Sequence, residues 1–162
     1  GQLANALGMP LETLPVPVVV QSPAARDAIM SEESIRTAME HARQCDIAFV
    51  GLGDVGPECT LVRTGHLSAQ TVAEFRERGA VGDILMRFYG SNGEYVPGPL
   101  ESCIISLEWA DIKRLPHIVA MAAGPRKVDA ILGALRGRLI HSLITDTDTA
   151  RQILGKAGVS EV

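Results

Sequence analysis

Short apolar runs alternate with helical patterns along the second half of the chain. Residues 117–123 and 139–144 are apolar runs of strand length, and residues 126–136 place apolar side chains at helical spacing. A last helix is expected to start at Thr145-Asp-Thr-Asp148, which matches a helix-capping pattern. Strand, helix, strand and helix in this order predict right-handed crossovers and a parallel sheet.

The first half of the chain contains one clear strand. Residues 46–53 form an almost continuous apolar run, which is typical of a parallel strand buried on both faces. Ser22, followed by Pro23, and Ser68 are good helix N-caps. Helices are therefore expected at 2–7, 22–30, 31–43 and 68–78, with extended chain at 13–20 and a loop at 53–65.

The middle of the chain predicts a small β-hairpin excursion around residues 82–105. Residues 81–89 alternate as a strand does, and Ser91-Asn-Gly-Glu94 is a hairpin turn signal. A short strand at 103–106 and a helix over 107–114 are expected next. The predicted fold class is therefore α/β, with a doubly wound, largely parallel sheet and this excursion.

Composition agrees with one domain of helices packed on a sheet. The 162 residues are 46% hydrophobic but only 4% aromatic, so the core must consist mainly of Ala, Val, Ile and Leu. Because no linker or repeat divides the chain, residues 1–162 are treated as a single domain. The net charge of −4, without a cluster of Lys and Arg, argues against direct nucleic-acid binding by this segment.

Cysteine usage and hydropathy predict the compartment. Cys45, Cys59 and Cys103 are odd in number and lack metal-binding spacing, as expected for reduced thiols. The apolar runs are too short to cross a membrane, and no signal peptide opens the chain. We therefore expect a cytoplasmic protein with no membrane partner.

A glycine-rich stretch follows the first predicted strand. Gly51-Leu-Gly53-Asp-Val-Gly56 reads as G-x-G-x-x-G, but a dinucleotide site needs a helix to open inside the motif. Pro57 and Glu58 follow here instead, so no cofactor is expected. The glycines, Gly53 among them, are interpreted as a loop that lets another group approach the backbone.

Gly124-Pro-Arg126-Lys127 is the best candidate for an anion site. It lies where a predicted parallel strand ends and a helix begins, so free backbone N–H groups and two cations converge there. A phosphate or carboxylate would bind favourably. The alternative is that these basic side chains are simply solvated.

Asp83 is the candidate for contacts to hydroxyl groups. It lies near the start of an apolar strand, where burying a carboxylate is costly unless a partner offsets it. It could accept hydrogen bonds from a sugar or pair with Lys127; alternatively it caps a local turn. The four histidines share no ligand spacing, so no metal is expected, and no catalytic motif is visible.

Motifs in a fixed order run through nearly the whole chain: 45–53, 79–84 with 87–89 and 92–93, 105–108, 115–124 with Lys127 and 130–131, and 143–146 with Ala150. Together they resemble the effector-binding domain of SorC/DeoR-type bacterial transcription regulators. The resemblance implies a Rossmann-like fold, similar to sugar-phosphate isomerases and glucosamine-phosphate deaminases, in which sensing replaces catalysis.

The resemblance also implies a phosphorylated sugar as effector and a homo-oligomeric regulator, either dimer or tetramer. By motif, the family's sugar-contacting acid falls on Asp83 and its phosphate-contacting lysine on Lys127. A basic residue of the loop after the first strand falls on Arg63. With Gly53, Gly124 and Arg126 from the residue-based interpretation, these form the predicted effector site.

The sequence departs from the family pattern at its start. The family domain begins with a further strand and a phosphate-cradling loop, after a helix-turn-helix segment, and none of these is visible here. We therefore expect an incomplete effector domain, which would meet DNA only through a helix-turn-helix domain absent from this chain.

Three hypotheses remain at this point. The first is the sensor domain of a sugar-responsive regulator, which catalyses nothing. The second is an isomerase-type or deaminase-type enzyme with the same fold, which would need a base and an acid near its substrate. The third is a fragment that serves only in oligomerisation. The sequence names neither the sugar nor the operator.

Overall fold

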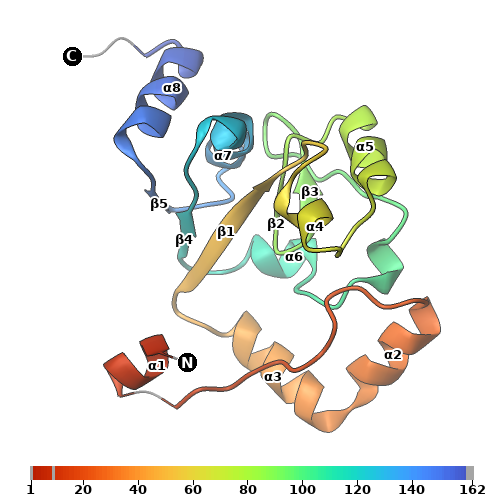
Figure 1. Ribbon diagram of the computed structural model, residues 1–162. Helices are drawn as coiled ribbons and strands as arrows, with labels where there is room; N and C mark the ends of the chain where they lie inside the picture. Colours follow the sequence, from red (N-terminus) through yellow and green to blue (C-terminus); the bar gives the residue numbers. More distant parts are fainter. Residues whose placement is uncertain (1, 9, 160–162) are drawn as a thin grey trace.

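A five-stranded mixed sheet, in the order β3-β2-β1-β4-β5, forms the centre of the fold (Figure 1). The computed structural model describes residues 2–8 and 10–159. β1 pairs in parallel with β4, and β4 with β5, whereas β1–β2 and β2–β3 are antiparallel. The strands are β1 (Ala48–Asp54), β2 (Gly82–Ile84), β3 (Arg87–Tyr89), β4 (Ile118–Met121) and β5 (Ser142–Ile144).

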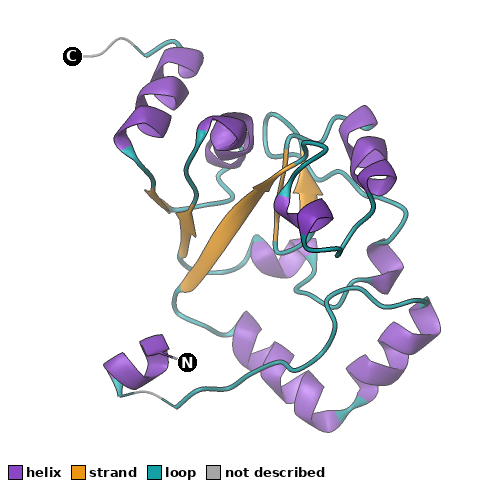
Figure 2. Cartoon of the chain, in the orientation of Figure 1, coloured by secondary structure: helices purple, strands orange, loops and turns teal. Residues whose placement is uncertain are grey.

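The helices occupy most of the positions that the sequence predicts. Figure 2 shows α2 and α3 together at the end of the molecule remote from α8. The helices are α1 (Gln2–Leu7), α2 (Pro23–Ser31), α3 (Glu33–Arg43), α4 (Thr60–Arg63), α5 (Ala69–Glu77), α6 (Trp109–Ile112), α7 (Val128–Arg136) and α8 (Thr147–Ala157), with 3-10 turns η1 (Glu101–Cys103) and η2 (Pro125–Lys127). The β4–α7–β5–α8 order confirms the predicted alternation.

Helix caps explain several of these boundaries. Ser22 accepts a hydrogen bond from Ala25 N–H at 3.2 Å, and Ser68 accepts one from Thr71 N–H at 3.0 Å, as the sequence predicts. The predicted start of α8 was wrong by one residue. Asp146, not Thr145, is the N-cap, because its carboxylate accepts the Thr149 N–H at 2.7 Å.

The stretch predicted as a single strand over 81–89 is two strands joined by a tight turn. Leu85 and Met86 both have positive φ, 51° and 66°, so the chain reverses between β2 and β3. Such turns normally use Gly, Asn or Asp, so no turn could be predicted at Leu85 and Met86 from residue type. Ser106 Oγ holds the turn by donating to Leu85 O at 2.8 Å. The second reversal, at Ser91–Glu94, is confirmed, since Gly90 N–H donates to Glu94 O.

Two other local predictions need correction. Residues 103–106 do not form a strand: Ile104 makes one isolated bridge to Val19, and the chain before it is the 3-10 turn η1. The predicted loop at 53–65 contains α4, a helix too short to show periodicity.

The two faces of the parallel strands differ sharply. One face packs Val50, Leu52, Ile118 and Ala120 into the main core together with Ile131 of α7. The other face exposes large apolar side chains: Phe49 is 57% exposed, Met121 50% and Ile144 55%. Within the described residues, helices therefore bury one face of this part of the sheet, whereas a doubly wound sheet is covered on both.

Candidate functional site

A cavity of about 260 Å³ lies at the carboxyl end of β1. The end of β1 pairs with β2 so that Gly53 faces Asp83, and η2 brings Lys127 to the same place. Gly53, Asp83 and Lys127, three of the sequence-predicted site residues, therefore line one cavity. Its remaining walls are Gly51, Leu52, Asp54, Thr60 and Leu61.

Asp83 is a buried carboxylate. Only 7% of the residue is exposed, and Oδ1 has no hydrogen-bond partner among the described residues. Burial raises the pKa of Asp83 to about 6; a hydrogen bond from the Met86 backbone and the charge of Lys127 oppose this rise, and nearby Asp54 adds to it. The turn-capping and ligand-binding interpretations are thus compatible, because Oδ1 of Asp83 has no hydrogen-bond partner among the described residues.

Gly53 makes room for this carboxylate. A Cβ atom at Gly53 would lie 1.6 Å from Asp83 Oδ1, so any side chain would displace the carboxylate. Gly51, two residues earlier on β1, has nothing within 4 Å of its Cβ position. Gly53 was expected to let another group approach the backbone. The group that approaches is the Asp83 side chain of the neighbouring strand β2.

Lys127 lies in the cavity beside Asp54, not paired with Asp83 as the sequence suggested. Its Nζ donates to Leu52 O and lies 3.9 Å from Asp54 Oδ1, and no Asp83–Lys127 ion pair forms within the described residues. Asp54 is itself buried and accepts the Gly56 N–H at 3.2 Å. Asp54 is a site residue that was not predicted, although an acid directly at the end of a buried strand is a recognisable signal.

The other predicted site residues lie around the cavity rather than in it. Gly124 has a φ of 105° and donates its N–H to Thr149 Oγ1 at 2.8 Å. Arg126 is largely exposed and lines a neighbouring hollow of about 360 Å³, which shares Asp54 with the first. Arg63 is exposed at the end of α4 and lines neither hollow. Their roles stay predictions.

The lining suits recognition of a polar ligand. Two carboxylates can accept hydrogen bonds from hydroxyl groups, and an ammonium group can bind an anion. The described histidines lie elsewhere: His117 and His141 stack at 5.4 Å beside the amino ends of β4 and β5. Among the residues that the structure describes, no cluster of three or more His, Cys, Asp or Glu could hold a metal ion. Nor is any described helix long and apolar enough to cross a membrane.

Substituting Gly53→Ala should lower the free energy of unfolding by about 1–3 kcal/mol, because the new methyl group overlaps Asp83. Urea unfolding followed by circular dichroism measures this change. Gly51→Ala is the matched control on the same strand and should change the value by less than about 1 kcal/mol. Equal losses in the two variants would contradict the close approach described here.

Comparison with known proteins shows the family to which this chain belongs. A family model described as "Putative sugar-binding domain" matches residues 1–155. The transcriptional regulator LsrR of Enterobacter sp. (strain 638) is 35% identical over 161 residues, which cover 98% of this chain and 49% of LsrR. The erythritol catabolism regulatory protein EryD of Brucella abortus is 32% identical over 157 residues, covering 96% of this chain and 49% of EryD.

A solved structure is similar to this chain over nearly its whole length. The structure described as "Putative Sugar-Binding Domain of Transcriptional Repressor from Vibrio fischeri" superimposes with a TM-score of 0.84 at 33% identity, covering 97% of this chain and 63% of that one. This chain spans about half the length of the curated relatives that it matches. It belongs to the family of sugar-binding domains of SorC/DeoR-type transcriptional regulators.

Proposed function

We propose that this domain senses a phosphorylated sugar and thereby regulates DNA binding by the longer protein of which it forms part. The observation that carries the proposal is the buried carboxylate of Asp83, with a free oxygen, in one cavity with Lys127. A buried acceptor without a partner is costly, and ligand hydroxyl groups would satisfy it. The relatives' names, which include an erythritol catabolism regulator, support a carbohydrate-related effector.

Within this proposal each residue has a distinct role. Asp83 and Asp54 accept hydrogen bonds from sugar hydroxyl groups, and Lys127 contacts the phosphate, since it supplies the only cation in the lining of the described cavity. Arg126, Gly124 and Arg63 lie farther out and would contact the effector only at its periphery. The fold assignment that accompanies this function is Rossmann-like, as in sugar-phosphate isomerases, acting in the cytoplasm without catalysis.

The exposed sheet face bears on how complete the site is. Gly51 lines the cavity, pairs with Met121 and lies, by strand alternation, on the same face of the sheet as Phe49. We infer that another part of the longer protein covers this face and closes the cavity. Binding by this chain alone should then be weaker than binding by the longer protein.

The test is titration calorimetry with sugar phosphates, their unphosphorylated sugars and inorganic phosphate. Lys127→Met should lower the affinity for a sugar phosphate at least tenfold, because a charge-assisted contact is lost, and should change the affinity for the unphosphorylated sugar much less. Lys113→Met is the control, since Lys113 is exposed and, within the part of the chain that the structure describes, its Nζ hydrogen-bonds only to Gly137 O, at 3.5 Å. Equal binding by the Lys127 and Lys113 variants would contradict the proposed phosphate contact.

The enzyme hypothesis makes a different prediction. Isomerisation or deamination needs a base and an acid beside the substrate, and in the described cavity both would have to come from Asp83, Asp54 and Lys127. Incubating the protein with each sugar phosphate that binds, and following the sugar by NMR, separates the sensing hypothesis from the enzyme hypothesis. Unchanged sugar supports sensing, whereas conversion that is lost in Asp83→Asn would overturn it.

A further inference from the structure

Residues 105–108 carry part of the family resemblance, but they do not line the candidate cavity. The segment contacts the hairpin of β2 and β3 instead. That hairpin contains Asp83, the acid on which the proposed function depends. The segment can therefore affect ligand recognition from outside the cavity, through the hairpin.

Ser106 and Leu107 hold the turn between β2 and β3 from both sides. Ser106 Oγ donates to Leu85 O at 2.8 Å, and Arg87 Nε donates to Leu107 O at 3.0 Å. Leu85 is the first residue of the turn, and Arg87 is the first residue of β3. The segment thus fixes the chain directly before and directly after Met86.

The turn needs this support because its own residues disfavour its conformation. Leu85 and Met86 have φ values of 51° and 66°. Gly, Asn and Asp adopt such values readily, whereas Leu and Met adopt them rarely. A conformation of this kind persists only where surrounding contacts impose it, and the hydroxyl group of Ser106 provides one such contact.

The conformation of the turn bears directly on Asp83. A hydrogen bond from the Met86 backbone N–H stabilises the Asp83 carboxylate and opposes the rise in its pKa. Oδ1 of Asp83 lies against Gly53 and has no hydrogen-bond partner among the described residues. If the turn relaxed to negative φ, the Met86 N–H would rotate away and the carboxylate would lose this contact.

We propose that Ser106 is a positioning residue for sugar recognition: it holds the Leu85–Met86 turn, which directs the Met86 N–H at Asp83 and leaves Oδ1 to accept a ligand hydroxyl group. The inference rests on the proposed function of Asp83 as the acid that binds hydroxyl groups. Lys127 is held from β1, by Leu52 O and Asp54, so Ser106 should not affect binding of the phosphate.

Titration of the Asp83 carboxyl group by carbon-13 NMR tests the positioning without any ligand. The original chain should titrate near its pKa of about 6. In Ser106→Ala the Met86 contact weakens, so the pKa of Asp83 should rise further, by roughly 0.5 or more. Ser142→Ala is the matched control and should leave this pKa unchanged, since Ser142 lies on β5 and its hydroxyl group pairs with His117 at 3.0 Å.

Two further variants separate positioning from a general loss of stability. Ser106→Thr keeps the hydroxyl group, so Asp83 should titrate as in the original chain. Leu85→Asn added to Ser106→Ala should bring the pKa of Asp83 back toward its original value, because Asn adopts positive φ readily. Circular dichroism confirms that each variant is folded. A pKa of Asp83 that is unchanged in Ser106→Ala, or that rises equally in Ser142→Ala, would overturn the proposal.

Calorimetry measures the effect on binding, with the sugar phosphate that binds most tightly in the proposed series and with inorganic phosphate. Ser106→Ala should lower the affinity for the sugar phosphate roughly fivefold, as expected for a misaligned hydrogen bond. It should leave the affinity for inorganic phosphate unchanged, and an equal loss for both would overturn the proposal. If no sugar phosphate binds, the proposed function fails, whereas the NMR titration still decides whether Ser106 positions Asp83.

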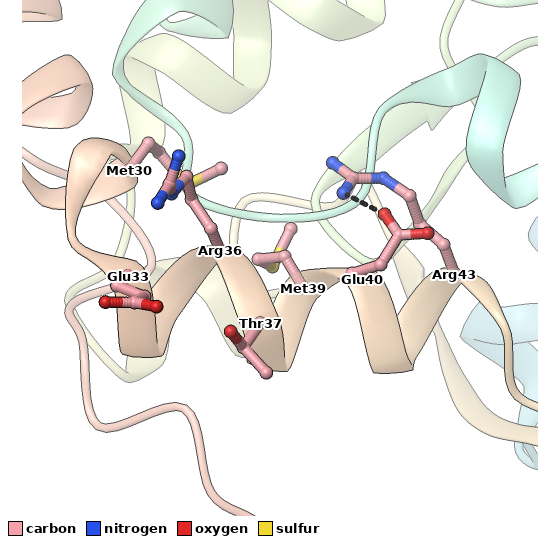
Figure 3. Close-up of a pocket in the computed structure, with 7 residues that line it drawn as sticks. All are labelled: Met30, Glu33, Arg36, Thr37, Met39, Glu40 and Arg43. Atoms are coloured by element: carbon pink, nitrogen blue, oxygen red, sulfur yellow. Dashed lines mark hydrogen bonds and ion pairs between the residues drawn. The ribbon is translucent and has the colours of Figure 1, made fainter.

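The hollow beside α3 provides a second control for the binding measurement. It has a volume of about 540 Å³ and is lined by α3 side chains, Glu33 among them, and by Met30 at the end of α2 (Figure 3). Its lining includes no residue of the β2–β3 hairpin or of the segment 105–108. Glu33→Gln should therefore leave the affinity for the sugar phosphate unchanged. A loss in Glu33→Gln without one in Ser106→Ala would locate the ligand beside α3 and overturn the proposal.

Discussion

Glu108→Gln should lower the free energy of unfolding by about 3 kcal/mol, the largest loss that we expect from any single substitution considered in this chain. Arg87 is only 1% exposed, and its Nη2 lies 2.9 Å from Glu108 Oε2. Its Nε donates to Leu107 O, but neither Nη atom has a well-aligned acceptor. Removing the carboxylate leaves a buried guanidinium group with Glu101, 3.8 Å away, as the one remaining acid that pairs with it among the described residues.

Glu108 also contacts Arg26 of α2, at 2.5 Å, so the substitution loosens the attachment of that helix. Urea unfolding at neutral pH measures the loss. Arg87→Met combined with Glu108→Gln is the informative control, because an apolar side chain in place of the buried charge should recover part of the stability. If Glu108→Gln alone costs less than about 0.5 kcal/mol, the pair behaves as an exposed surface contact and the account is wrong.

The second large effect is a pH-dependent gain from Asp83→Asn. The folded state raises the pKa of Asp83 from 3.8 to about 6, so it holds the proton more tightly than the unfolded chain does. The favourable contribution of Asp83 is therefore complete below pH 3.8 and is lost as the pH rises through 6. Above that range the ionised carboxylate costs on the order of 2–3 kcal/mol, a penalty that the amide avoids.

Thermal unfolding at pH 8 and at pH 4 measures this difference. The variant should melt about 5 °C higher than the original chain at pH 8, and at nearly the same temperature at pH 4. Asp46→Asn, at an exposed position before β1, is the control and should have no comparable effect. A gain of equal size at both pH values would mean that the amide acts through packing rather than through the charge.

Periodicity in the sequence predicted the parallel half of the fold because short apolar strands alternate there with the regular helices α7 and α8. The β4–α7–β5–α8 unit and the caps at Ser22 and Ser68 follow from local patterns alone. The turn at Leu85–Met86 does not, since neither residue favours positive φ. Contacts from Ser106 and the pairing of β2 with β3 impose that conformation, and both depend on the tertiary structure.

In the candidate site, too, some features follow from local sequence patterns and others depend on the tertiary structure. Asp83, Gly53 and Lys127 could be predicted because each stands at a recognisable position beside a strand end, and they do line one cavity. The pairing of Lys127 with Asp54 rather than Asp83 could not, because it depends on how η2 docks against β1. Arg87 reads as an ordinary polar position in a strand, and its partners Glu101 and Glu108 lie 14 and 21 residues along the chain.

The uncovered face of the parallel strands has a consequence for the temperature dependence of stability. Phe49, Met121 and Ile144 are already about half hydrated in the folded chain, so unfolding transfers less of their apolar surface to water. The heat-capacity increment of unfolding comes mainly from newly hydrated apolar surface. The free energy of unfolding of this chain should therefore vary less steeply with temperature than that of a domain of equal length whose sheet is buried on both faces.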